Sequence, residues 1–288
     1  MSFTALVCDS TAALPQEFVE KHGVSVIPLY LKVGDVTYRD RVDISAEEFY
    51  QRLPSCNPLP TTSQPSAGDF VALYQDLVER GATGIISIHL SAGISGTINS
   101  ATLAAAEIDS VPIEIVDTES TSVAVMFAVE AGVWALEAGA TMEEALIPIR
   151  RVVEQQKLVF SVDTLEYLYK GGRIGGAAAL VGSLLQFKPL LYFSEGKIDA
   201  LERVRTSKRA LVRMAELLAD WMGSEEPVRV GVIEADCPDR GQALAELARQ
   251  HMNVADLGIH TLTPVLGAHG GNGTVGLCCC PLSAFQWG

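Results

Sequence analysis

The sequence predicts an α/β protein of two domains: an N-terminal domain with a mainly parallel sheet covered by helices, and a C-terminal domain with a mixed sheet and helices. Apolar runs alternate with helical patterns through the first half of the chain, as in parallel strands joined by crossover helices. Past residue 156 a hairpin signal replaces this alternation. The 288 residues, 48% of them hydrophobic, can fill two cores. We therefore expect domains over residues 1–156 and 157–288.

In the N-terminal half, each expected strand is an apolar run that ends in polar turn residues. The first run ends at Asp9, whose side chain can cap a helix. Ser45 lies three residues ahead of Glu48, the spacing of a capping box, so a helix begins near Ala46. The expected strands cover 4–9, 24–33, 36–38, 84–89 and 113–116, and the expected helices begin at 46, 66 and 97, with two apolar helices over 123–156.

In the C-terminal half, a Ser-Glu-Gly turn between residues 190–193 and 197–204 predicts an antiparallel hairpin. The apolar stretch over 177–193 is interrupted by polar residues and a proline, so it predicts a buried helix followed by a strand rather than a membrane span. The other expected elements are strands near 158 and over 228–234, 258–262 and 274–280, and helices over 207–222 and 239–251.

Charge and composition exclude several classes of partner. Lys and Arg total 21 against 35 Asp and Glu, a formal net charge of −14, so the protein repels nucleic acid and anionic membrane surfaces. The first residues lack the basic and apolar stretches of a signal peptide, and we expect a cytoplasmic protein without stable membrane insertion. The six cysteines include no CxxC pair and no nearby His at zinc-site spacing, so we expect reduced, core-filling thiols and no metal.

Hydroxyl, glycine and imidazole groups concentrate in three segments that lie outside the periodic elements, at 60–66, 91–97 and 267–273. The middle segment follows a strand and precedes a helix, so the N–H groups near Ser95 and Gly96 lie at a helix N-terminus, where small anions bind. It lacks the glycine patterns of dinucleotide and nucleoside triphosphate sites. A capped turn is also an ordinary structural element, so the pattern alone leaves both interpretations open.

The remaining polar signals are one histidine and two basic spots. His269 lies among glycines in an expected loop ahead of the last strand, where its side chain either points at a neighbouring domain or faces water. Arg173 and Arg205 belong to the densest basic spots of this acidic chain. Such spots are either solvated edges or sites for a phosphate or an acidic partner, which Arg can bind bidentately.

Taken together, these segments resemble motifs of the DegV family, in family order and over almost the whole chain. In two places this chain departs from the family pattern. The final loop reads His-Gly-Gly-Asn-Gly where the family usually has His-Val-Gly-Pro-Gly, and Arg41 replaces a usual glycine. The matching segments are Asp9-Ser10-Thr11, 38–44, 60–66, 94–97, 171–174, 188–190 and 269–273.

The resemblance implies a two-domain fold with a long-chain fatty acid bound between the domains. It implies that the carboxylate is hydrogen-bonded by Thr62, by Ser95, by the N–H of Gly96 and by His269, with Thr61 beside them. The protein would then be a lipid-binding carrier in phospholipid synthesis, not an enzyme, and it would need no cofactor.

The resemblance also implies a protein partner. Bound acid would be presented to a separate ATP-dependent fatty acid kinase that makes an acyl phosphate, and Arg173 and Arg205 would contact the phosphorylated head group or the kinase. We expect the carrier itself to be a monomer.

Elementary energetics are compatible with such a ligand. Burying about fifteen methylenes contributes on the order of 12 kcal/mol before ordering costs. A carboxylate taken out of water costs several kcal/mol unless charge-assisted hydrogen bonds replace its hydration. The apolar helices over 123–138 and 177–185 either line the tunnel or form ordinary core.

Two other functions stay open from the residues. In a serine acyl hydrolase, Ser95 would be the nucleophile, His269 the base and Asp117 or Asp9 the orienting carboxylate. However, the sequence around Ser95 lacks the first glycine of the GxSxG motif. In a kinase component, a small polar metabolite would occupy a wet cavity between the domains.

Overall fold

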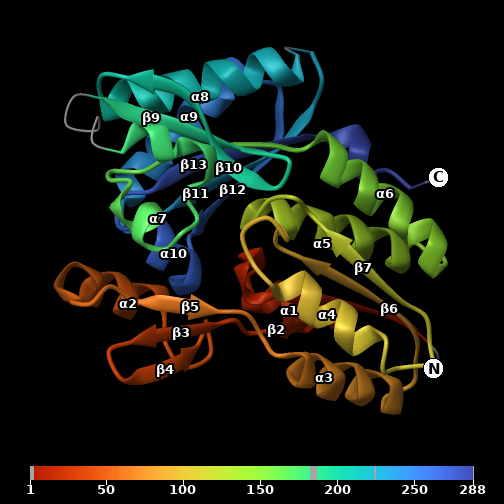
Figure 1. Cartoon of the computed structure of the whole chain (residues 1–288). Helices are drawn as coiled ribbons and strands as arrows, with labels where there is room; N and C mark the ends of the chain where they lie inside the picture. Colours follow the sequence, from red (N-terminus) through yellow and green to blue (C-terminus); the bar gives the residue numbers. More distant parts are fainter. Residues whose placement is uncertain (1–2, 182–186, 224, 288) are drawn as a thin grey trace.

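A computed structural model describes residues 3–181, 187–223 and 225–287 (Figure 1). Four strands of the N-terminal half form a parallel sheet in the order β2-β1-β6-β7, as the alternation predicted. The carboxyl ends of parallel strands share one edge, so the loops after β1, β6 and β7 lie together. These elements are β1 (Phe3–Asp9), α1 (Gln16–His22), β2 (Ser25–Ile27), α3 (Ala67–Glu79), β6 (Ala82–His89), α4 (Thr97–Ala105), β7 (Ile113–Asp117), α5 (Val123–Glu137) and α6 (Met142–Gln155).

The single strand expected over 24–33 is wrong, because it is two strands in different sheets. β2 pairs with β1, whereas β3 (Tyr30–Val33) pairs with β4 (Val36–Arg39) and with β5 (Thr61–Ser63) in an antiparallel three-stranded sheet. Pro28, which has no N–H for a ladder, lies at the break. The segment over 60–66, expected outside the periodic elements, thus supplies a strand.

Side-chain caps determine where two of the helices begin. At α2 (Ala46–Arg52) the Ser45 hydroxyl accepts the N–H of Glu48 at 3.1 Å, which confirms the predicted start. At α3, Ser66 and Asp69 form a reciprocal capping box. The Ser66 cap lies three residues after the end of β5 (Thr61–Ser63), so the chain passes from the strand into α3 within a short turn.

The C-terminal half forms the expected mixed sheet, in the order β10-β9-β8-β13-β11-β12. The predicted hairpin is confirmed, since β9 and β10 are antiparallel around the turn at 195–196. Only β11 and β12 pair in parallel. The elements are β8 (Lys157–Ser161), α7 (Glu166–Lys170), β9 (Lys188–Ser194), β10 (Lys197–Val204), α8 (Ser207–Met222), β11 (Val228–Glu234), α9 (Pro238–His251), β12 (Val254–Thr261), α10 (Pro264–Gly270) and β13 (Val275–Pro281).

The largest hydrophobic core joins the two halves of the chain. α5 and α6 lie between the two large sheets (Figure 1), and their side chains pack with residues of β1, β6, β11 and β13. α6 ends one residue before the expected boundary at 156 and β8 begins one residue after it. The division into domains at that residue stays a prediction.

The buried helix expected from residue 177 is a 3-10 helix over Gly175–Leu180, and residues 182–186 of that expectation lie outside the described residues. Gly175 has a φ of +51°, and a side chain there would overlap the backbone of Ile198 on β10. The absence of a side chain at Gly175 therefore lets this segment pack directly against the backbone of the β9–β10 hairpin. Ala177 and Leu180 are buried in a small core under β9 and β10.

Candidate functional site

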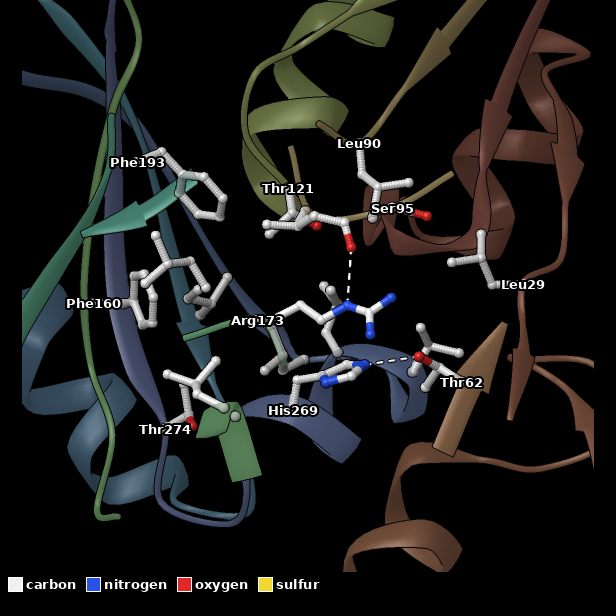
Figure 2. A pocket seen from close by; sticks show the side chains of 18 of the residues that line it. Leu29, Thr62, Leu90, Ser95, Thr121, Phe160, Arg173, Phe193, His269 and Thr274 are labelled. Carbon is white, nitrogen blue, oxygen red and sulfur yellow. Dashed lines mark hydrogen bonds between the residues drawn. The ribbon is translucent and has the colours of Figure 1, made fainter. Parts of the chain in front are cut away.

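A central cavity lies between the carboxyl edge of the parallel sheet and the mixed sheet (Figure 2). Most of its wall is aliphatic or aromatic, and its hydrogen-bonding groups come from β5 and the residue after it, from the loops after β6 and β7, from the turn after α7, from α10 and from the residue before β13. No residue of α5 or of the described part of 177–185 lines it, so for these residues the structure favours ordinary core, the second of the two alternatives. The principal lining residues are Leu29, Thr62, Gln64, Leu90, Ile94, Ser95, Thr121, Leu158, Phe160, Leu168, Arg173, Phe193, Ile198, Ile233, Leu262, Val265, Leu266, His269 and Thr274.

His269 lies in the last turn of α10, not in the loop that its glycine-rich surroundings predicted. Pro264 is the first residue of this helix, a position that proline favours because its missing N–H has no intrahelical partner there. The glycines serve close packing: a Cβ on Gly267 would meet the ring of Tyr50. The helix aims His269 across the cavity, where its Nε2 and the Oγ1 of Thr62 are 2.7 Å apart (Figure 2).

Burial makes His269 a weak base. It lowers the pKa of the imidazole to about 4, and the nearby positive charge of Arg173 acts in the same direction. At neutral pH the ring is therefore uncharged and donates through only one nitrogen. The Nδ1 atom is buried and has no hydrogen-bond partner among the residues that the structure describes, so a ligand oxygen at this nitrogen would satisfy it.

Arg173 follows α7 and places its guanidinium group in the cavity wall beside His269 (Figure 2). Its Nε donates to the carbonyl of Ile94 at 3.0 Å and its Nη1 to the carbonyl of Gly171 at 2.8 Å. The first bond joins the turn after α7 to the serine loop after β6, so one cation connects the two halves of the chain at the polar end of the cavity.

The serine loop, residues 91–96, contributes Ser95 to the cavity. The Ser91 hydroxyl donates to the carbonyl of Gly196 at 2.6 Å, which fixes the loop against the β9–β10 turn. The Ser95 hydroxyl is 2.9 Å from that of Thr97, at the start of α4. Gly96 has no acceptor for its N–H among the described residues, but the side chain of Gln64 packs over it, so Gly96 itself does not line the cavity.

An outer groove adjoins the cavity at its polar end. It shares Thr62, Arg173 and His269 with the cavity and is also lined by Thr61, whose side chain is exposed. Thr61 does not line the cavity that Thr62 lines. The other residues of the outer groove are 53–54, 56–60, Glu166, Tyr167, Lys170, Gly171 and Ala268.

Arg205 is not brought to this site. It follows β10 with its side chain exposed, and it lines neither the central cavity nor the outer groove. Of the predicted site residues, the structure thus brings together Thr62, Ser95, His269 and Arg173, and it leaves Thr61 and Gly96 just behind them.

Two buried carboxylates hold the elements of the site in place. Asp9 accepts the N–H of Leu90 at 2.9 Å and is 3.1 Å from Nδ1 of His89, so it anchors the start of the serine loop. Asp40 accepts the Ser10 hydroxyl and the N–H of Val265, the second residue of α10. Burial raises the pKa of Asp40 to about 6, and these hydrogen bonds oppose that rise.

The contacts of a serine hydrolase are not formed. Ser95 is hydrogen-bonded within its own loop and His269 to Thr62, and no carboxylate orients His269 among the described residues. Asp9 is bonded to His89, and Asp117 accepts backbone N–H groups of the loops beside it. The apolar wall also disagrees with a wet cavity for a small polar metabolite.

Sequence reasoning missed four polar residues of the cavity, Ser63, Gln64, Thr121 and Thr274. Gln64 lies inside the 60–66 segment, but no role was assigned to it. Thr121 belongs to a run of three hydroxyl residues between β7 and α5, the same kind of strand-to-helix signal that drew attention to Ser95. Its hydroxyl is buried and has no hydrogen-bond partner among the described residues.

The cysteines form no disulfide among the described residues. All six cysteines are free thiols, and Cys8 and Cys278–Cys280 are buried in the cores. Burial raises the pKa of Cys280 to about 12. In the described ranges no three His, Cys, Asp or Glu side chains are grouped so that they could hold a metal ion, and no helix is both long and apolar enough to cross a bilayer.

The geometry defines an α/β protein that encloses an apolar cavity between two sheets, with hydroxyls, an imidazole and one guanidinium group at one end. The chain belongs to the DegV family. The model of that family, described as "Uncharacterised protein, DegV family", matches residues 4–282.

Known proteins agree with this membership over nearly the full length. A DegV domain-containing protein of Streptomyces coelicolor is 41% identical over 274 residues, which cover 95% of this chain and 96% of the relative. The structure of a DegV family protein from Thermus thermophilus, which is described as binding fatty acid, superposes on this chain with a TM-score of 0.92 at 35% identity. The match covers 97% of this chain and 100% of that one. DegV of Bacillus subtilis, described as a fatty acid binding protein, has a TM-score of 0.88 at 34% identity, covering 97% and 99%.

Proposed function

We propose that this protein is a carrier of long-chain fatty acids. The acyl chain occupies the central cavity, and its carboxylate is hydrogen-bonded by Thr62, Ser95 and His269, with Arg173 as the counter-ion. The observation that carries the proposal is that these four side chains, from distant segments, meet in a cavity whose wall is mostly apolar (Figure 2). The fatty acid binding described for similar DegV structures supports it.

The direct test is to identify what co-purifies with the protein. Native mass spectrometry of freshly purified material, followed by organic extraction, is expected to find long-chain fatty acid in near-stoichiometric amount. Protein without any fatty acid, from a host that makes them, would reject the carrier. Labelling of Ser95 by a fluorophosphonate probe would instead favour the hydrolase.

We propose further that the bound acid is handed to a separate ATP-dependent kinase, in the cytoplasm, by a monomeric carrier that catalyses nothing itself. The outer groove supports this step, because it leads from Thr62, Arg173 and His269 to the surface and also carries Lys170. Arg205 would contact the kinase rather than the lipid, since its exposed side chain lines neither the cavity nor the groove. Acyl phosphate formation from the loaded protein, the kinase and ATP tests the proposal.

Replacing Ser95 and His269 together by alanine is expected to weaken fatty acid binding by about 100- to 10,000-fold. A hydrogen bond to a charged group contributes roughly 1.5–3 kcal/mol, and the double variant removes two such donors. Both side chains are only half-buried, so the fold should survive. Titration with a fluorescent fatty acid measures the affinity, and circular dichroism checks the fold. Unchanged affinity would place the carboxylate elsewhere.

Fatty acid binding is expected to strengthen as the pH falls from neutral through the pKa that His269 acquires beside the bound carboxylate, as titrations with a fluorescent fatty acid at a series of pH values would measure. In the free protein the pKa of His269 is lowered to about 4, and a carboxylate beside the ring favours its protonated form. The complex therefore holds more protons than its separated partners between pH 4 and the raised pKa, and affinity rises as pH falls through that window.

A matched pair of variants isolates the histidine. His269→Asn should flatten this pH dependence. His260→Asn should retain it, because burial also lowers the pKa of His260 to about 4 although that residue lines neither the cavity nor the outer groove. If both variants lost the pH dependence of fatty acid binding equally, its assignment to His269 would be disproved.

A further inference from the structure

The central cavity has a polar and an apolar end. Thr62 and His269 mark the polar end, and across the cavity from Thr62 lie the aromatic rings of Phe160 and Phe193 (Figure 2). These two rings are 6.1 Å apart between centroids. Phe193 also pairs across the hairpin with Ile198, another residue of the cavity wall.

Behind the apolar end lies a second hollow, the edge groove, which is open to solvent and lined by many charged residues. Only Leu158 and Phe193 line both the central cavity and the edge groove. Among the described residues these two side chains are therefore the partition between an apolar space and a polar one. The other residues of the edge groove are 115–120, Arg150, Val153, Glu154, Gln156, Lys157, Tyr192, Glu195, Gly196 and Trp221.

The two members of the partition differ in how they are packed. Leu158 is 7% exposed, on β8 inside the sheet, where it belongs to the main core. Phe193 is only half-buried and packs at the margin of two hydrophobic cores. Shortening Phe193 would therefore open the partition at a small structural cost, whereas shortening Leu158 would damage the core.

We propose that Phe193, seated beside Leu158, ends the acyl cavity and sets the longest fatty acid that the protein accepts. The proposal rests on the function proposed above. A chain that stops at the ring is fully enclosed. A longer chain must displace the ring or enter a groove lined by charged residues, where its added methylenes stay partly in water and contribute little.

The test measures affinity for straight-chain saturated acids from dodecanoate to docosanoate. For wild type, affinity should rise by up to roughly fourfold per methylene and then stop rising at a cut-off length. In Phe193→Ala the cut-off should move to longer acids, because the removed ring leaves room for further methylenes. In Phe193→Trp it should move to shorter ones, and Phe193→Leu, which disturbs packing least, should give a smaller shift in the direction of the alanine variant.

Tyr192→Ala is the matched control, because Tyr192 is the neighbouring aromatic residue and lines the edge groove but not the cavity. Its cut-off should equal that of wild type. If wild type binds acids and none of the folded Phe193 variants shifts the cut-off, this inference is overturned while the carrier function stands. If wild type binds no acid of the series, the carrier function itself is rejected.

Discussion

Asp9→Ala is expected to lower the free energy of unfolding by about 3–5 kcal/mol, because several buried donors share this one acceptor and each buried donor left without a partner costs about 1–3 kcal/mol. Asp9 and His89 are both fully buried, and the ring of His89 is further bonded to Ser87, which also accepts the hydroxyl of Tyr74. Without the carboxylate, the imidazole of His89 and the N–H of Leu90 lose their acceptor where water cannot replace it. Urea unfolding followed by circular dichroism measures the change.

The matched control for this variant is Asp117→Ala. Asp117 also ends a strand of the parallel sheet. It accepts two backbone N–H groups, from Ala92 at 3.2 Å and Glu119 at 2.8 Å, just as Asp9 accepts those of Thr11 and Leu90. It is half-buried and has no histidine partner among the described residues, so its loss should cost only about 1 kcal/mol, as for an exposed cap. Equal losses in the two variants would show that the buried pair adds nothing to strand-end capping.

Gly171→Ala is expected to weaken fatty acid binding by about 10- to 100-fold, although residue 171 contributes no side chain to the site. A Cβ at this position would overlap Nδ1 of His269 and lie 2.9 Å from its Cε1 and 2.8 Å from the carbonyl oxygen of Tyr167. The carbonyl cannot move freely, so the imidazole must. A displaced ring loses its bond to Thr62 and its place at the polar end of the cavity. Titration with a fluorescent fatty acid measures the loss.

Gly172→Asn serves as the control, because a Cβ on Gly172 would meet no atom within 4 Å. Its φ of +71° is one that asparagine adopts more readily than other residues. We expect near-normal binding in this variant. Normal binding in Gly171→Ala as well would mean that His269 is not needed where the structure has it. A temperature scan of both variants excludes simple unfolding as the cause.

Local patterns determined most of the elements. The Ser45 and Ser66 caps, the turn at 194–196 and the alternation of apolar runs each act through neighbours within a few residues, so they could be read from the chain. The exceptions depend on distant partners. β3 lies outside the parallel sheet because it pairs with β5, some thirty residues further along the chain. α10 is a helix whose Gly267 packs against Tyr50. A glycine-rich segment is predicted as a loop unless the distant side chain that packs against its glycines, here Tyr50, is known.

The sequence by itself determined the α/β class, the acidic surface and the family motifs that named Thr62, Ser95 and His269. Only the tertiary structure decided that Arg173 lines the cavity with them, that Thr61 lies outside it and that Phe193 lines both the cavity and the edge groove. The physical reason is the range of the interactions. Caps and periodicity act over one or two turns, whereas the walls of a cavity come from segments up to two hundred residues apart, and only the packed chain brings them together.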